Sequence, residues 1–233
     1  QTTRNNILGI LTDEDKQIVF TDTPGIHEPT SMLAEMMGKS ANNALVDTDA
    51  ILLLVEPIAN VGRTEEKIIE RLKKQKTPVI LVINKIDTVK KDVLLSVIAT
   101  YTSVFEFAAV VPISARKSDG VDAVRAEIEK FIKPGPQYFP EDMVTDQPQR
   151  QIAAEIIREK LLRSLNKEVP HGIAIEIFSF EESASKLTIE ANIYCEKQSH
   201  KGIIIGKGGE MLKKIGTEAR TELERMHVKK VFL

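Results

Sequence analysis

Two uninterrupted apolar runs constrain the fold of this 233-residue chain more than any other feature. Ala50–Val55 and Pro78–Ile83 contain no polar side chain. A strand that is apolar on both faces has to be covered on both faces, as happens in a parallel sheet flanked by helices. The helix-like stretches Arg63–Lys74 and Val89–Tyr101 follow these two runs and supply such a cover. The first part of the chain is therefore predicted to be an α/β fold with a mainly parallel sheet.

The other segments of residues 1–133 extend this pattern. Ile7–Leu11 and Gln17–Thr23 have strand patterns and are separated by a hairpin-like connection. Three further elements are expected, namely helix Met32–Leu45, strand Ala108–Ser114 and helix Val121–Ile132. Because parallel sheets of this kind bind ligands outside the carboxyl ends of their strands, the residues that follow each strand are the candidates for a site.

A linker over residues 134–149 and a second unit over residues 150–233 complete the expected organisation. The linker contains four prolines and little periodicity. The second unit shows a helix, two alternating strands, a glycine-rich loop between two helical segments, and a final strand: Arg150–Leu165, Gly172–Phe180, Lys186–Glu196, Met211–Met226 and Val228–Leu233. This order, αββααβ, predicts a compact α+β domain.

Composition excludes several classes of protein. The formal net charge of −2 shows no global basicity. The single cysteine, Cys195, excludes an internal disulfide framework and fits a reducing compartment; it is expected to be a small buried residue in a strand. No apolar run approaches the roughly 20 residues needed to span a bilayer.

The tetrapeptide Asn84-Lys85-Ile86-Asp87 follows the second apolar run and suggests recognition of guanine. The Asp87 carboxylate can accept hydrogen bonds from N1–H and the exocyclic amine of guanine, whereas adenine presents an acceptor in place of N1–H. Such a site can discriminate by roughly four orders of magnitude. Asn84 is expected to clamp the purine and a neighbouring loop, and Lys85 to lay its stem over the base. A polar strand end without a ligand is the alternative.

A second motif, Asp22-Thr23-Pro24-Gly25, closes the strand Gln17–Thr23. Asp22 is expected to hold Mg²⁺ through water. Gly25 is expected to offer its backbone N–H to a terminal phosphate, because glycine permits close approach. The segment that begins at Ile26 would then respond to that phosphate by becoming ordered. The alternative is a plain turn, since Pro-Gly is common in turns.

Two further positions complete the order of motifs found in GTP-binding domains. Ser114-Ala115 ends the strand after the tetrapeptide, and a small residue there lets a backbone N–H donate to guanine O6. Upstream of the hairpin, Thr3 can ligate Mg²⁺ through its hydroxyl and sense the γ-phosphate. This succession of motifs at strand ends weighs against the non-functional interpretations.

The glycine-rich loop of the second unit predicts RNA binding. Gly206-Lys207-Gly208-Gly209 has the GxxG spacing that lets a phosphate backbone approach main-chain N–H groups at a helix N-terminus. From Lys197 to Lys214 there are five lysines, Lys201 and Lys213 among them, and one acidic residue. With the αββααβ order, this matches a KH domain, which clamps single-stranded RNA. A simple helix–helix turn is the alternative.

These motifs resemble those of the translation-factor-related small GTPases, and within them the Era family, over essentially the whole chain. The resemblance implies a P-loop NTPase-type G domain followed by a type II KH domain, with GTP or GDP and Mg²⁺ as cofactors. Its nucleotide-binding residues correspond to Asp22-Thr23-Pro24-Gly25-Ile26, to Asn84-Lys85-Ile86-Asp87 and to Ser114-Ala115, with Thr3 and Asp22 as metal ligands and Thr3 and Gly25 acting in hydrolysis. Its RNA-binding residues correspond to Lys201, Gly206, Lys207, Gly208, Gly209 and Lys213.

The resemblance also implies partners and a location. The partners are small-subunit ribosomal RNA near its 3′ end and the small ribosomal subunit during its assembly. The location is the cytoplasm, with peripheral contact at the inner membrane, and the protein is expected to be a monomer. Ras-like proteins carry a water-orienting glutamine after this motif. Ile26 stands there in this chain, so hydrolysis must use another device.

A phosphate-binding G-x-x-x-x-G-K-[ST] loop is expected to precede residue 1. Gly38-Lys39-Ser40 fails the pattern because Leu33 occupies the place of the first glycine. Gly206-Lys207 fails because Lys201 occupies that place. The G domain is therefore expected to lack its first strand and P-loop, and the KH domain to be cut at its C-terminus. A non-enzymatic RNA-binding KH protein with a degenerate nucleotide fold is the alternative function.

A polypeptide of residues 1–233 alone is predicted to bind GTP poorly and not to hydrolyse it. Losing the loop removes several charge-assisted hydrogen bonds, each contributing roughly 1.5–3 kcal/mol. A total of about 6 kcal/mol corresponds to roughly four decades in affinity. Titration calorimetry and a phosphate-release assay measure both properties, and GTP turnover by this polypeptide would contradict the prediction.

Overall fold

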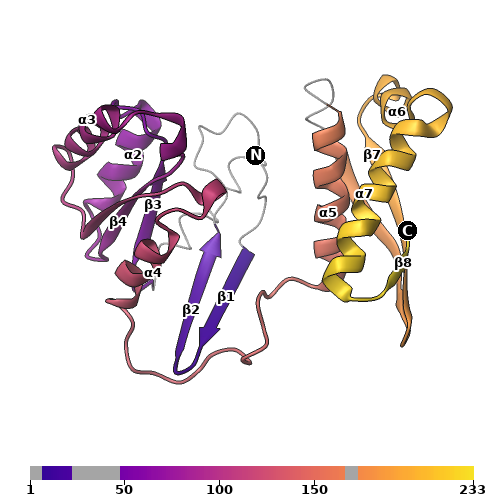
Figure 1. Cartoon of the computed structure of the whole chain (residues 1–233), viewed down its shortest axis with the longest axis horizontal. Helices are drawn as coiled ribbons and strands as arrows, with labels where there is room; N and C mark the ends of the chain where they lie inside the picture. Colours follow the sequence, from indigo (N-terminus) through magenta and orange to yellow (C-terminus); the bar gives the residue numbers. More distant parts are fainter. Residues whose placement is uncertain (1–6, 23–47, 166–172) are drawn as a thin grey trace. The chain divides into compact units, whose positions relative to one another are not determined.

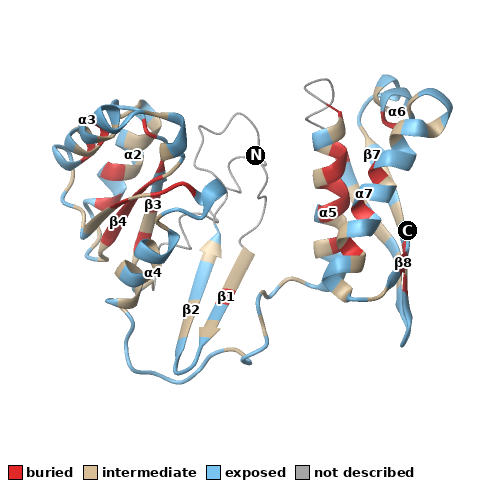
Figure 2. Cartoon of the chain, viewed as in Figure 1, coloured by how far each residue is buried: buried red, intermediate tan, exposed pale blue. Residues whose placement is uncertain are grey.

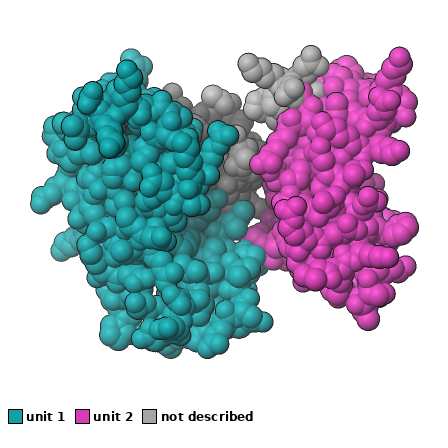
Figure 3. Space-filling view, in the orientation of Figure 1, with its two compact units in different colours: residues 1–146 teal, residues 147–233 magenta. Residues whose placement is uncertain are grey.

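The computed structural model describes residues 7–22, 48–165 and 173–233. They form two compact units, residues 1–146 and 147–233 (Figure 3). The division falls inside the segment 134–149 that was expected to be a linker. The expected helix Met32–Leu45 and the site residues Thr3 and Thr23–Ile26 lie outside the described residues.

A parallel three-stranded sheet organises the first unit, as predicted. Its strands are β3 (Ile51–Val55), β4 (Val79–Ile83) and β5 (Ala109–Pro112), in the order β3-β4-β5 (Figure 1). All five residues of β4 are buried. The second apolar run of the sequence is therefore the central strand.

Helices cover both faces of this sheet. Side chains of α2 (Arg63–Leu72) and α3 (Lys91–Thr102) form one core with β4, and α4 (Val121–Glu129) contributes to a second core. Within β4, Leu81 and Ile83 belong to the first core and Ile80 and Val82 to the second. Alternate side chains of a strand point to opposite faces, so the uninterrupted apolar run has a direct structural cause.

A β-hairpin, β1 (Ile7–Asp13) and β2 (Lys16–Asp22), precedes the sheet. The sequence predicted strand Ile7–Leu11 and a five-residue connection. The strands instead pair as far as Asp13 and Lys16, and Gln17 Nε2 donates to Thr12 Oγ1 at 2.9 Å across the last part of the hairpin.

Ion pairs join the turn end of the hairpin to α4. Arg125 pairs with Asp13 and donates from Nε to Glu129 Oε1 at 2.8 Å. Lys16 Nζ lies 3.1 Å from the other carboxylate oxygen of Glu129. The hairpin is thus tied to the helix that covers the second core.

Residues 138–146 of the proline-rich segment lie along the hairpin. Ile10 N donates to Val144 O at 2.9 Å, and Leu8 N donates to Asp146 Oδ1 at 3.1 Å. The side chain of Gln17 donates to Phe139 O at 2.9 Å, and its Oε1 accepts from the backbone N–H groups of residues 138 and 139 at 3.0 Å each. These bonds involve backbone atoms and the side chains of Gln17 and Asp146, so no hydrophobic periodicity predicts them.

The second unit has the predicted αββααβ order. Its elements are α5 (Gln149–Ser164), β6 (Ile173–Glu182), β7 (Lys186–Cys195), α6 (Gln198–Ile205), α7 (Glu210–His227) and β8 (Lys230–Phe232). β7 is central, antiparallel to β6 and parallel to β8. α5 and α7 pack on one face through buried residues, among them Ile157, Leu187 and Leu223 (Figure 2). In the parts of the chain that the structure describes, no helix has the length and apolarity needed to cross a membrane.

Replacing Leu81 with alanine is expected to destabilise the first unit by about 2–5 kcal/mol, because the central strand would lose a fully buried side chain and keep a cavity. Chemical denaturation measures the change. The matched control is Leu95→Ala, since Leu95 is 68% exposed on α3. Equal stabilities of the two variants would contradict the assigned core.

Candidate nucleotide and RNA sites

The carboxyl ends of the three parallel strands meet at one edge of the sheet. Glu56 follows β3, the segment Asn84–Asp87 follows β4, and Ser114 and Ala115 follow β5. Strand pairing continues into these loops, because Asn84 N donates to the carbonyl oxygen of residue 55 at 2.9 Å. The parallel register therefore brings together segments that lie far apart in the sequence.

Asn84 joins two of these loops. Its Oδ1 accepts a hydrogen bond from Lys85 N at 2.7 Å and another from Ala115 N at 3.0 Å. The loop after β4 is thereby fixed to the loop after β5. Asn84 was predicted to contact both the purine and a neighbouring loop. These two hydrogen bonds are the contact with the neighbouring loop.

Asp87 is oriented by Ser114. The Ser114 hydroxyl donates to Asp87 Oδ1 at 2.7 Å, and this hydrogen bond is the main reason that the pKa of Asp87 lies below its usual value. The side chain of Asp87 is exposed, whereas Ser114 is buried. A carboxylate has lone pairs on both oxygens, so Asp87 stays ionised and keeps acceptor capacity for the edge of a base.

Two reciprocal backbone hydrogen bonds hold Ser114 in place. Ser114 N donates to Asp119 O at 2.9 Å, and Asp119 N donates to Ser114 O at 3.1 Å. The loop closes at Gly120, where φ is +76° and a Cβ would lie 2.6 Å from Pro112 O. Only glycine fits there without a backbone shift. The sequence had indicated Ser114 as a small residue, and the structure adds its hydroxyl contact.

Lys85 is directed towards a residue that sequence reasoning missed. Its backbone has the left-handed conformation, with φ +66°, and its ammonium forms an ion pair with Glu56. Glu56 is the first polar residue after the apolar strand β3, which is the pattern that could have identified it. The predicted position of the Lys85 stem over a base stays a prediction.

Asp22 is the one predicted magnesium ligand that the structure describes. It is exposed at the end of β2, opposite Ile7. Magnesium takes oxygen ligands and is commonly held by one or two carboxylates together with substrate phosphates and water. Across residues 7–22, 48–165 and 173–233, no three His, Cys, Asp or Glu side chains gather to hold a metal.

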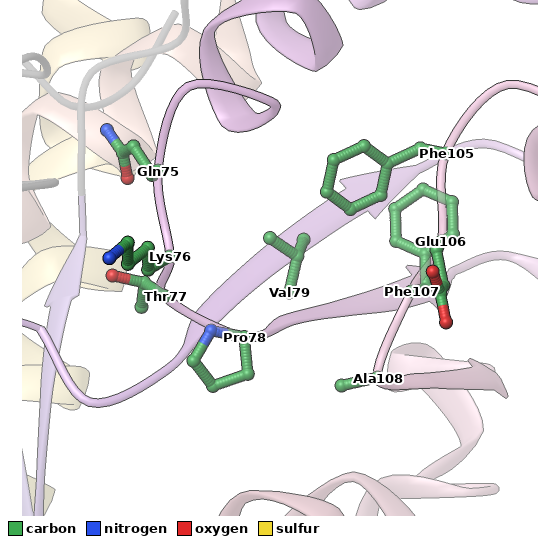
Figure 4. Close-up of a pocket in the computed structure, with 9 residues that line it drawn as sticks. All are labelled: Gln75, Lys76, Thr77, Pro78, Val79, Phe105, Glu106, Phe107 and Ala108. Atoms are coloured by element: carbon green, nitrogen blue, oxygen red, sulfur yellow. The ribbon is translucent and has the colours of Figure 1, made fainter.

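A separate hollow of about 300 Å³ lies at the opposite ends of the strands (Figure 4). It is lined by the segment that leads into β4 and by the segment that leads into β5, including Gln75, Phe105 and Phe107. The two phenylalanine rings lie 4.9 Å apart. Because Asn84 and Ser114 follow the other ends of these strands, this hollow is not the predicted nucleotide site.

The predicted RNA loop connects α6 to α7. Gly206 ends α6 with φ +74°, and its N–H donates to Gly202 O at 2.9 Å. Gly208 and Gly209 also have positive φ, at +61° and +83°. The backbone of this loop thus has positive φ values that residues with a side chain rarely adopt. The loop lies directly before the N-terminus of α7.

The three glycines have different roles. A Cβ at Gly206 would lie 2.6 Å from the Cβ of Met211, so this glycine is required by packing within the domain. No atom lies within 4 Å of a Cβ placed at Gly208 or Gly209. Those two positions leave open space in which a phosphate can approach the backbone.

Exposed basic and apolar side chains surround the loop. Lys201, Lys207 and Lys213 are exposed, as expected for phosphate contacts. Ile203, Ile205 and Leu212 are also exposed, at 37%, 37% and 41%. Within the run Ile203–Ile205 only Ile204 is buried, because the other two face away from the core. Sequence reasoning did not name the residues of this apolar surface, which suits nonpolar contact with unstacked bases.

Comparison with known families matches both units. The profile of a family described as 50S ribosome-binding GTPase matches residues 1–85, and that of a KH domain matches residues 168–233. The chain is 51% identical to GTPase Era of Ruminiclostridium cellulolyticum, over 100% of this chain and 78% of that protein. It is also 51% identical to GTPase Era of Caldanaerobacter subterraneus subsp. tengcongensis, over 100% and 79%.

Two solved structures are similar over the whole chain. One is a crystal structure of Era in complex with MgGDPNP and nucleotides 1506–1542 of 16S ribosomal RNA. The other is a variant of Aquifex aeolicus Era bound to GDP·AlF4⁻. Each has a TM-score of 0.93 and 37% identity, and covers 100% of this chain and 80% of the solved one.

Ser114→Ala is expected to raise the pKa of Asp87 towards its usual value, because the hydroxyl that stabilises the carboxylate is removed. A lowered pKa in the folded protein stabilises it above the unfolded-state pKa, and this contribution is lost as pH falls through the folded-state pKa. In the variant the folded-state and unfolded-state pKa values come together, so this contribution and its pH dependence should largely disappear. Carbon-13 NMR of the Asp87 carboxyl follows the titration.

The control for this titration is Ser96→Ala. The Ser96 hydroxyl bonds within α3, to the carbonyl oxygen of Asp92. Its removal should leave the Asp87 curve unchanged. An Asp87 titration that is the same with and without the Ser114 hydroxyl would contradict the assigned hydrogen bond.

Proposed function

This chain belongs to the Era family of GTPases, and we propose that it acts as a GTP-binding, GTP-hydrolysing switch that binds small-subunit ribosomal RNA and assists assembly of the small ribosomal subunit. The single observation that carries the nucleotide half is the Asp87 carboxylate, which Ser114 holds ionised and exposed beside the Asn84–Ala115 clamp. The expected cytoplasmic location, the contact with the inner membrane and the monomeric state stay predictions.

Guanine fits the edge where these residues meet. Asp87 accepts from N1–H and the exocyclic amine, and the backbone near Ala115 donates to O6. Adenine would leave the carboxylate without donors. In a site built around hydrogen bonds, an unpaired group costs more free energy than a formed hydrogen bond contributes. The Glu56–Lys85 ion pair fixes the ammonium of Lys85 at the same edge.

Hydrolysis would involve Thr3, Asp22 and Gly25. Magnesium, when bound, would neutralise phosphate charge, with the Thr3 hydroxyl and the Asp22 carboxylate as its protein ligands. Gly25 N–H would donate to the terminal phosphate. Ile26 cannot orient a water, so backbone groups, a cation or a partner would take that role.

The second unit supplies the RNA clamp. Gly208 and Gly209 leave open space at a helix N-terminus, exposed lysines lie around them, and the exposed side chains of Ile203, Ile205 and Leu212 offer surface for bases. Small-subunit RNA is proposed because the solved Era complex, which is similar over the whole chain, holds a segment of 16S RNA. The family profile that mentions the 50S subunit covers residues 1–85 and so includes none of this clamp.

The hairpin provides a route by which nucleotide could influence RNA binding. In the sequence it lies between Thr3 and the segment Asp22–Ile26, the two regions proposed to respond to the γ-phosphate. Its strand β1 and Gln17 bind the segment that leads to the second unit. A change at either end of the hairpin would act on these bonds. Identical RNA affinity of the full-length protein with GTP, GDP and no nucleotide would rule this coupling out.

Asp87→Asn is expected to exchange guanine for xanthine specificity. An amide still accepts from N1–H, but its NH₂ group faces the guanine amine and would instead donate to the C2 carbonyl of xanthine. GTP affinity of the full-length protein should fall by roughly three to four orders of magnitude, and XTP affinity should rise. Titration calorimetry measures both. Asp92→Asn on α3 is the matched control, and an unchanged GTP-to-XTP ratio for Asp87→Asn would refute the proposed base contact.

Replacing Lys207 and Gly208 together with aspartate is expected to abolish RNA binding, lowering affinity at least about a hundredfold through lost and repelled phosphate contacts. The fold should survive, because Gly208 has open space around it and aspartate tolerates positive φ better than most residues. Filter binding of a 3′-terminal small-subunit RNA oligonucleotide measures the effect. The control replaces Ser185, which precedes β7, and Lys186, the first residue of β7, with aspartate, which changes the charge equally. Unchanged binding of the loop variant would favour a protein-binding role for the loop.

A further inference from the structure

One face of the β6-β7-β8 sheet carries exposed aromatic and acidic side chains. α5 and α7 pack on the other face. We call six exposed residues of two strands the acidic–aromatic face: Ala174, Glu176 and Phe178 of β6, and Glu190, Asn192 and Tyr194 of β7. Phe178 is 69% exposed and Tyr194 is 53% exposed. Apolar side chains that gather on one exposed surface mark interaction sites, whereas singly scattered ones do not.

Hydrogen bonds hold three side chains of this face together. Tyr194 OH donates to Glu176 Oε2 at 2.5 Å, and Asn192 Nδ2 donates to the same oxygen at 3.4 Å. The bond from Tyr194 is the main cause that holds the pKa of Glu176 below its usual value. The face therefore presents a fixed, ionised carboxylate beside an aromatic ring.

A β-bulge places Phe178 on this face. Ile177 pairs with Ala191 while Ser179 pairs with Glu190, so Phe178 is the extra residue of β6. Bulges of this kind redirect side chains and are common beside functional sites. Arg150 of α5 supports the bulge, donating from Nη2 to Ile177 O at 3.4 Å and to Phe178 O at 3.2 Å. The exposed ring is thus part of a supported feature of the backbone.

The charge of the face determines which partner it suits. Its six residues include two carboxylates, Glu176 and Glu190, and no basic side chain. The exposed Lys186 and Lys230 lie on the same side of the sheet but pair with each other at the first residue of β7. A phosphate backbone would be repelled here, in contrast to the loop at Gly206–Gly209 with its neighbouring lysines. Lysine and arginine carry long apolar stems and a cationic group, and aromatic rings attract such groups. A basic polypeptide matches both properties of the face.

We propose that the acidic–aromatic face docks a cationic segment of a partner protein, whose lysine or arginine groups pair with Glu176 and Glu190 while their stems pack on Phe178 and Tyr194. This docking is separate from the RNA clamp and does not depend on the nucleotide or RNA function proposed above. Charge complementarity of this kind chiefly sets specificity and the rate of association.

The test uses full-length protein and two synthetic peptides, one alternating lysine with valine and one alternating glutamate with valine. Fluorescence anisotropy at low salt should show saturable binding of the lysine peptide alone. Glu190→Lys and Phe178→Ala should each weaken that binding about tenfold, since one removes a charge pair and the other an aromatic anchor. Glu218→Lys on α7 is the matched charge control and should leave peptide affinity unchanged.

The affinity of each of the three variants for the RNA oligonucleotide should be unchanged. This measurement is the control that the domain remains folded. The proposal is overturned if the lysine peptide does not bind, if the glutamate peptide binds equally well, or if Glu190→Lys and Glu218→Lys weaken binding to the same extent.

Discussion

Burial of β4 on both faces is the constraint on which the nucleotide half of the molecule depends. A strand enclosed by α2 and α3 on one side and by α4 on the other has to pair in parallel with β3 and β5, because each connection carries a covering helix. Parallel pairing in turn places every carboxyl end at one edge. The side chains that follow these strands meet there, although Glu56 and Ser114 are far apart in the sequence. The proposed base-binding edge is therefore a consequence of how an apolar strand is covered.

Fine positioning at that edge comes from short polar contacts. Asn84 fixes one loop to the next, and Ser114 holds the carboxylate of Asp87 ionised. The buried Ser114 is held by two backbone hydrogen bonds and by the tight turn at Gly120. The exposed carboxylate thus inherits its orientation from a buried scaffold, and little reorganisation is needed when a base arrives.

The second unit separates two surfaces of opposite charge. Around the glycine loop, lysines and exposed isoleucines suit a single-stranded nucleic acid. On the acidic–aromatic face, carboxylates and rings suit a basic polypeptide. An RNA-binding domain with both surfaces could hold RNA and a basic protein together without competition between them, a combination that fits work on a ribonucleoprotein particle.

The amino-acid sequence by itself determined the class of both domains and the order of their elements, and it supplied most of the proposed site residues. Apolar periodicity and motif spacing are local properties, and they identified the strand Val79–Ile83, the guanine tetrapeptide and the GxxG loop. Only the tertiary structure decided the roles that arise from contacts between distant segments. It showed that Ser114 orients Asp87, that Glu56 pairs with Lys85, that Gly206 is required by Met211, and that Gln17 binds the segment once expected to be a plain linker. A hydrogen bond or an ion pair depends on positions in space, and a single exposed glutamate or glutamine carries no periodic pattern from which those positions could be predicted.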